Sequence, residues 1–159
     1  MPQETWNPTI RLYHVREERL PSGSLIQPER WGKRVLQDGG KHPFFFREHI
    51  LEIWRQVKTT IGVSRFNCAF AFEELEQANR WAAEEHGGFI HSVVPADPTA
   101  AQARLDMLWL TWMGEPNVST VEVVRSCAAY WAGHCTKDAN PNAYPAWEWL
   151  FACPLKVVP

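Results

Sequence analysis

The sequence predicts an α+β protein with a split, mixed and mainly antiparallel β-sheet flanked by helices. Strand-like and helical patterns alternate along the chain in the order β-β-α-β-α-β-α-α-β-β. Of the 159 residues, 45% are hydrophobic and 21% are charged, which suffices to bury one proper core. We therefore expect a single domain over residues 1–159.

The first two strands are predicted near the N-terminus. Residues 10–15, IRLYHV, alternate between apolar and polar side chains, as is typical of a strand. Pro21, Gly23 and Pro28 then place turns around Leu25 and Ile26. The pattern predicts a strand, a turn and a short second strand.

The middle of the chain predicts a helix, a strand, a helix and a strand in turn. From Phe44 to about Thr60, one helical stripe holds the apolar residues Phe46, Ile50, Ile53, Trp54 and Val57. The segment SRFNCAFAF after Gly62 alternates large and small residues, which indicates a buried strand. A helix follows over EELEQANRWAAEEHGG, with acidic residues in its first turn and two glycines at its end. FIHSVV at 89–94 predicts the next strand.

The last third of the chain predicts two helices and two strands. Residues 99–113 carry large apolar side chains that predict a helix, whose tryptophans fit either the core or a cleft. Ser119 and Glu122 have capping-box spacing before a helix that reaches Trp131. After a polar loop, WEWLF and LKVV predict the final strands.

Charge and composition narrow the classes of partner. A formal net charge of -2 gives no overall attraction to nucleic acid or anionic lipid, so an anionic ligand requires a few local groups. The chain shows no signal-peptide pattern and no apolar stretch of membrane-spanning length. Its cysteines form no CxxC pair. We expect a cytoplasmic protein without a metal site or a membrane partner.

The strongest catalytic motifs, such as a phosphate-binding glycine loop, HExxH or GxSxG, do not occur in the sequence. Polar residues on apolar strands remain as candidates: His14, the Ser64-Arg65 pair and Glu148. Glu148 lies between two tryptophans, so it either faces solvent on an edge or points into a partly dry pocket. Arg65 fits either a surface ion pair or a forked contact with phosphate, beside which Ser64 would donate.

Three segments carry a resemblance to a known family. LYHV on the first strand, SRFNCAFAF running into EELEQANRWA, and PAWEWLFACPLKVV resemble the ADP-ribosyltransferase superfamily in its smaller bacterial and phage-associated branches. With AAYWAG, they are also similar to a bacterial family of uncharacterised domains. The resemblance covers residues 10 to 158 approximately, and it implies a split sheet that clasps NAD, the substrate.

The resemblance implies roles for the residues that match. His14 would hydrogen-bond ribose hydroxyls of NAD, with Tyr13 beside it in the NAD site. Glu148 would contact the 2'-hydroxyl of the nicotinamide ribose. Many relatives have a tyrosine against the nicotinamide, whereas this chain offers Phe70 or Phe72, which keep a stacking face and lose the hydroxyl.

These roles suit the chemistry of an ADP-ribosyltransferase. Cleavage of the bond from nicotinamide to ribose develops positive charge on the sugar, so a carboxylate near the ring stabilises the transition state more than the ground state. The expected function is NAD-dependent mono-ADP-ribosyl transfer to an unidentified protein, nucleic acid or small molecule. A nucleic-acid acceptor is disfavoured by the charge. Its setting would be that of a toxin, an effector delivered into another cell, or a factor in phage–bacteria conflict.

Several alternatives stay open at this point. Without the tyrosine, the chain fits a weak NAD glycohydrolase or a domain that binds NAD or a nucleotide without turnover. NAD-dependent removal of a 2'-phosphate from RNA is disfavoured by the lack of basic clusters. The last alternative is a non-catalytic interaction module, in which the tryptophan-rich segment 105–112 forms the partner-binding face.

Overall fold

Strands make up one sheet in the computed structural model, which describes residues 4–84 and 87–159. Within these residues, seven strands pair in the order β2-β7-β4-β1-β3-β6-β5, and every pair is antiparallel. The strands are β1 (Leu12–Arg16), β2 (Leu25–Ile26), β3 (Ala69–Phe72), β4 (Phe89–Pro95), β5 (Gln102–Asp106), β6 (Trp147–Phe151) and β7 (Leu155–Val157). The α+β class with an antiparallel sheet and flanking helices is confirmed. The prediction of a mixed sheet is wrong, because no described strand pair is parallel.

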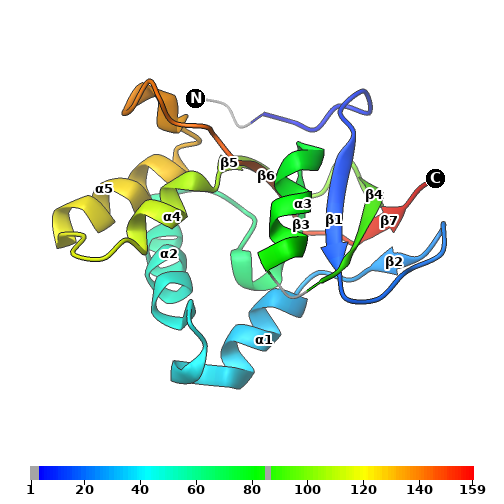
Figure 1. Cartoon of the computed structure of the whole chain (residues 1–159), viewed down its shortest axis with the longest axis horizontal. Coiled ribbons are helices and arrows are strands. Elements are labelled where there is room, and N and C mark those ends of the chain that lie inside the picture. The colour runs from blue at the N-terminus through cyan, green and yellow to red at the C-terminus, as the bar shows by residue number, and fades with distance from the viewer. Residues whose placement is uncertain (1–3, 85–86) are drawn as a thin grey trace.

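Helices gather unevenly around this sheet. They are α1 (Arg30–Asp38), α2 (Phe45–Lys58), α3 (Leu75–Glu84), α4 (Leu108–Met113) and α5 (Thr120–Trp131), with short 3-10 turns η1 (Gly39–Lys41), η2 (Arg65–Asn67) and η3 (Thr136–Asp138). In Figure 1, α2, α4 and α5 lie beside the β5 and β6 end of the sheet, away from β2 and β7. The helices therefore cover mainly the β5 and β6 end of the sheet.

The two faces of the sheet bury different residues. On β3, Ala69 and Ala71 join one hydrophobic cluster with Trp149 of β6. Phe70 packs on the other side against a second cluster, which includes Leu150 of β6 and residues of α4 and α5. This alternation agrees with the period-two pattern predicted for the segment, except that residues 65–67 form η2 in place of strand.

The centre of the sheet opens between β1 and β3. β1 pairs with β4 along its whole length, from Leu12 to Arg16. In the part of the chain that the structure describes, β1 and β3 share a single paired position, Tyr13 with Phe72. The two strands therefore part, and the gap leaves room for side chains between them.

Most predicted elements are confirmed. The helix after Ser119 begins with a capping box, in which the Ser119 hydroxyl accepts from the Glu122 N–H and the Glu122 carboxylate accepts from the Ser119 N–H. The first, second, fourth and last two predicted strands correspond to β1, β2, β4, β6 and β7. Residues 85 and 86, which the sequence assigns to the end of the helix over EELEQANRWAAEEHGG, lie outside the described residues.

The prediction of one helix over 99–113 is wrong for its first half. Residues 102–106 form β5, which pairs with β6, and only Leu108–Met113 is helical. Ala103 and Leu105 are buried while Gln102 and Arg104 are partly exposed, so the segment has the period of a strand. Pairing with β6 decides the conformation because it satisfies the backbone polar groups of both strands.

Helix α1 has no counterpart among the predicted elements. Its interior contains Gly32, a residue that disfavours helices by about 1 kcal/mol relative to alanine. The structure explains this glycine: a Cβ at position 32 would lie 2.0 Å from the carbonyl oxygen of Phe66. Gly32 thus lets α1 press against η2, next to Arg65.

The apolar stripe of α2 does not face the core. Phe46 and Ile53 are 71% and 62% exposed, and Ile50 and Val57 are exposed as well. Leu51 and Glu48 are the buried residues of this helix in the described chain, and Trp54 is partly buried. The helix is therefore turned so that a carboxylate points inward, which requires cationic partners inside.

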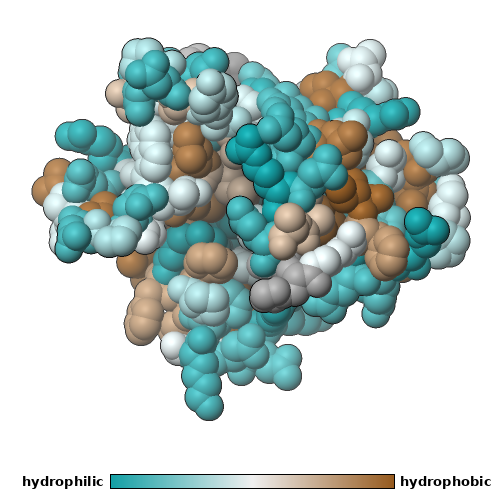
Figure 2. Space-filling model, viewed as in Figure 1, coloured by the Kyte–Doolittle hydropathy of each residue, from teal (hydrophilic) through white to brown (hydrophobic). Residues whose placement is uncertain are grey.

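Surface hydropathy shows no single dominant feature on the face in view. In Figure 2, hydrophobic residues reach the surface in several patches separated by hydrophilic ones. Among the described residues, no helix has both the length and the apolar character needed to cross a membrane.

Candidate functional site

A cavity of about 580 Å³ opens where β1 and β3 part. Its walls come from β1, β3 and β6 and from helices α1, α2, α3 and α4. The volume lies in the range of about 300–1,000 Å³ that is usual for small-molecule sites. Five of the predicted site residues line this one cavity: His14, Arg65, Phe70, Phe72 and Glu148.

Two predicted site residues do not line the cavity. Tyr13 neighbours His14 on β1, and adjacent strand residues point to opposite faces of a sheet. The Ser64 hydroxyl donates to Glu52 and accepts from the Phe66 N–H, which caps η2. The structure therefore places Tyr13 and Ser64 outside the wall that the other five residues share.

His14 stands in the gap between β1 and β3. Its Nδ1 lies 2.6 Å from the carbonyl oxygen of Phe70. A carbonyl only accepts, so Nδ1 carries the proton and Nε2 of the neutral ring is an acceptor. Burial lowers the pKa of His14 to about 4, despite the bond to Phe70, so the ring is neutral at pH 7.

Glu148 points inward from β6. It is 2% exposed, lies opposite Phe72 of β3 and Leu105 of β5, and lines the cavity. Its Oε1 accepts from Arg65 Nη1 at 2.5 Å and from the Tyr130 hydroxyl at 2.7 Å. No donor among residues 4–84 and 87–159 reaches Oε2. One oxygen is thus fixed by the protein, and the other is left for a ligand.

Arg65 is buried at the centre of this arrangement, with 4% exposure. Its Nε and Nη2 donate to the two oxygens of Glu48, at 2.8 and 3.3 Å, and Nη1 donates to Tyr130 and Glu148. The interpretation as a surface ion pair is therefore wrong, because both partners are buried carboxylates. A bidentate contact between Arg65 and a phosphate remains a prediction, and it would compete with the hydrogen bonds from Arg65 to Glu48 and Glu148.

Arg65 and Glu48 hold each other in their ionised forms. Burial works against the charge of Arg65, but Glu148 and Glu48 outweigh it and raise its pKa further above the usual range. Burial likewise opposes ionisation of Glu48, yet Arg65 and Arg47 bring its pKa below the ordinary value. The buried Tyr130 has a raised pKa, so its hydroxyl stays protonated and donates to Glu148.

We call Glu48, Arg65, Tyr130 and Glu148 the Glu148 network. Neither Glu48 nor Tyr130 was selected from the sequence as a candidate site residue. Only the structure shows that Arg65 is buried and that the apolar stripe of α2 is exposed, so no signal in the sequence points to an inward Glu48. Nothing in the sequence distinguishes Tyr130 from a core aromatic residue.

The phenylalanines predicted to stack on nicotinamide differ in their surroundings. Phe70 is partly exposed, and the Arg65 guanidinium carbon lies 4.8 Å from its ring centroid. Trp31 meets the Phe70 ring edge-on, with centroids 6.5 Å apart. Phe72 is buried at the wall, where its ring packs against Trp81 of α3. Phe70 therefore offers the more accessible ring.

The mouth of the cavity carries many arginines. Besides Arg65, the lining includes Arg16, Arg30, Arg34, Arg47 and Arg80. Glu17, which also lines the cavity, lies 3.8 Å from Arg30, and both side chains are largely exposed. Glu84, Glu115 and Glu148 also line the cavity, so the described lining holds six arginines and four glutamates. The excess of positive charge favours a ligand that bears negative charge.

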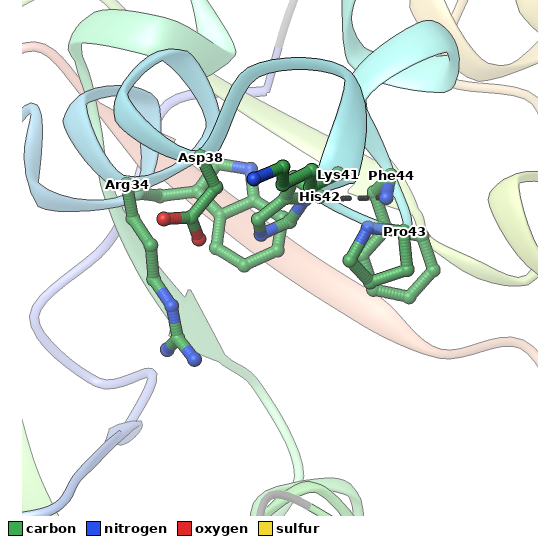
Figure 3. Close-up of a pocket in the computed structure, with 7 residues that line it drawn as sticks. Arg34, Asp38, Lys41, His42, Pro43 and Phe44 are labelled. Atoms are coloured by element: carbon green, nitrogen blue, oxygen red, sulfur yellow. Dashed lines mark hydrogen bonds between the residues drawn. The ribbon is translucent and has the colours of Figure 1, made fainter.

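A smaller cavity of about 330 Å³ adjoins the mouth, between α1 and the start of α2. Trp31, Arg34 and Phe44 line both cavities. Figure 3 shows the hydrogen bond from the Phe44 N–H to His42 and the Arg34 side chain extending away from these two residues. No predicted site residue lines this smaller cavity, so the candidate site is the larger one.

The tryptophan-rich segment 105–112 is mainly core. Leu105 and Leu110 are buried, and Trp109, 5% exposed, donates from its indole N–H to the carbonyl of His134. Trp112 is partly buried against the same cluster. Leu105, Trp109 and Leu110 therefore offer little surface to a partner, and the interaction module that uses this segment stays a prediction.

Comparison with known proteins adds no relative: no family model matches the chain, and no curated protein matches it.

Proposed function

We propose that this protein is an NAD-dependent mono-ADP-ribosyltransferase with an ADP-ribosyltransferase-like split sheet. The observation that carries the proposal is the convergence of His14, from the start of the chain, and Glu148, from its end, on one cavity of about 580 Å³. The opening between β1 and β3 is the split in which NAD would lie. The arginines at the mouth suit the negative charge of its phosphates.

Glu148 is the proposed catalytic residue. Its Oε2, to which no described residue donates a hydrogen bond, would accept one from the 2'-hydroxyl of the nicotinamide ribose. The carboxylate would then stabilise the positive charge that develops on the sugar as the bond to nicotinamide breaks. The nicotinamide leaves with the bonding electrons, and the acceptor forms the new bond to the ribose carbon and releases its proton to solvent.

His14 is proposed to position NAD. Because Nδ1–H is fixed to the carbonyl of Phe70, the neutral ring presents Nε2 as an acceptor for a ribose hydroxyl. Phe70 would supply the stacking face for nicotinamide, with a contribution of about 1 kcal/mol beyond area burial. Phe72 lies deeper in the wall and supports this surface.

Nicotinamide release tests the proposal. We expect the purified protein to release nicotinamide from NAD, with water as acceptor when no other is supplied. Glu148→Gln keeps an oxygen for Arg65 and Tyr130 but removes the charge, so its rate should fall by about 10²–10³-fold. Circular dichroism should show the same fold in both proteins. Wild-type protein that releases no nicotinamide, alone or with cell extract as acceptor, would contradict the proposed catalysis.

Binding of NAD without turnover is the second candidate. The observation that favours it is the phenylalanine pair, Phe70 and Phe72, which supplies no hydroxyl at the predicted nicotinamide position. In that case NAD raises the melting temperature of the protein, and no nicotinamide appears. A cytoplasmic location and a role as a toxin, an effector or a defence factor are part of this proposal.

A further inference from the structure

For Glu148 to bind a ligand through Oε2, the protein must hold the carboxylate through Oε1 alone. Arg65 determines whether Oε2 stays free, because a guanidinium prefers to bind a carboxylate through two parallel hydrogen bonds. Such a bidentate pair with Glu148 would take both Oε1 and Oε2. In the structure, Arg65 gives Glu148 only Nη1, which donates to Oε1.

The rest of the Arg65 fork is occupied by Glu48. Nε donates to Glu48 Oε2 at 2.8 Å, and Nη2 donates to Oε1 at 3.3 Å. Glu48 is itself held by Arg47, whose Nη2 lies 2.8 Å from Oε1 and whose guanidinium carbon lies 4.0 Å from the Phe44 ring centroid. These contacts fix the plane of the Arg65 guanidinium.

We infer that Glu48 is a positioning residue for Glu148: by occupying Nε and Nη2 of Arg65, it limits that guanidinium to Oε1 and keeps Oε2 open to the cavity. Glu48 is 1% exposed and does not line the cavity, so it acts through Arg65 and not on the ligand. The inference rests on the proposed role of Glu148 toward NAD and adds a residue that the reaction would depend on.

Glu48→Gln tests the inference. Glutamine retains one acceptor and loses the charge, so Arg65 should turn its fork to Glu148 and bind both of its oxygens. We expect kcat for nicotinamide release to fall by about 10- to 100-fold, with a much smaller change in KM for NAD. In a Glu148→Gln background, Glu48→Gln should cause no further loss, whereas a general weakening of the fold would reduce activity in both backgrounds.

Glu52→Gln is the matched control. Glu52 lies one turn further along α2 and binds Nε and Nη2 of Arg55 as Glu48 binds those of Arg65. It has no contact with Glu148 in the described chain, so we expect kcat within about twofold of wild type. An equal loss in Glu52→Gln and Glu48→Gln would overturn the inference.

A crystal structure of Glu48→Gln without NAD separates this inference from the proposed function. Two hydrogen bonds from Arg65 to both oxygens of Glu148 support it, even if wild-type protein does not cleave NAD. Arg65 still bound to Oε1 alone, with Oε2 open, overturns it. Should Glu48→Gln not fold, Glu48→Asp keeps the charge and withdraws the carboxylate by one methylene, and the same two outcomes decide.

Discussion

Asp106 and Glu148 are two buried acids on neighbouring strands, and they are satisfied in opposite ways. Asp106 of β5 lies opposite Trp147 of β6, so it is one position away from Glu148 along the ladder. Asp106 is 0% exposed. Its Oδ1 accepts from the N–H groups of Leu108 and Ala146, and its Oδ2 accepts from the N–H and hydroxyl of Thr136.

The contrast lies in what each carboxylate leaves unused. Both oxygens of Asp106 accept from backbone and hydroxyl donors of α4, η3 and the residue before β6, and these bonds tie the three segments to β5. Glu148 has one filled oxygen and one oxygen without a donor in the described residues, and it borders the cavity. Burial alone therefore does not mark a functional acid. An acceptor without a protein donor at a cavity is the feature that suggests a ligand-binding acid, because a ligand can donate to it there.

Asp106→Asn should have the largest effect on stability. The amide group would face the Thr136 N–H and hydroxyl, so two hydrogen bonds to a charged acceptor are lost and a buried donor is left unsatisfied. We expect the free energy of unfolding in urea to fall by about 4 kcal/mol, while the folded fraction keeps its rate of nicotinamide release. A change below about 1 kcal/mol would remove the contrast with Glu148.

Acidification should destabilise the protein through His14. Its folded pKa of about 4 lies below the unfolded value of 6.5, so the unfolded chain binds the proton first. Stability is full above pH 6.5 and is lost as the pH falls toward 4, by up to about 3 kcal/mol. The partial exposure of His14 to the cavity reduces this value. Urea unfolding at several pH values measures it.

His14→Asn provides the control for this pH dependence. Asparagine keeps a donor for the Phe70 carbonyl but does not titrate, so the slope of stability between pH 6.5 and 4 should be smaller than in wild type. Equal slopes in the two proteins would mean that other groups cause the acid sensitivity.

Tyr130→Phe should have the smallest effect. It removes one donor to Glu148 Oε1 and one acceptor for Arg65 Nη1, while the hydrogen bond from Nη1 to Glu148 remains. We expect a loss of about 1–2 kcal/mol in the free energy of unfolding and a decrease below about tenfold in nicotinamide release. The coupling with Glu148→Gln, measured as a double-mutant cycle in unfolding, should be nonzero because the two groups are in contact. Strictly additive losses would place Tyr130 outside the Glu148 network.

The fold class and most elements could be predicted from the sequence because their signals are local. The capping box at Ser119 and the alternation around Phe70 depend only on neighbouring residues. β5 was mistaken for helix because its strand conformation depends on pairing with β6, which lies about 45 residues away in the sequence. Helix α1 was missed because Gly32 is explained only by its approach to Phe66.

The strand residues of the candidate site could be predicted from the sequence, but the residues that hold them in place could not. His14 and Glu148 stand out as polar residues on apolar strands, and the structure brings them to one cavity. The inward rotation of Glu48 contradicts the amphipathic pattern of α2, since helical periodicity measures only the distribution of apolar residues. Its burial is set by Arg65, a residue on another element, and no local pattern records that pairing.

A crystal structure with NAD, or with an analogue that resists cleavage, tests the central claim most directly. The account predicts that one NAD molecule fills the cavity, with Glu148 Oε2 within hydrogen-bond distance of the 2'-hydroxyl of the nicotinamide ribose and His14 Nε2 on a ribose hydroxyl. NAD bound elsewhere, or in the cavity with Glu148 Oε2 touching no atom of it, would contradict the account.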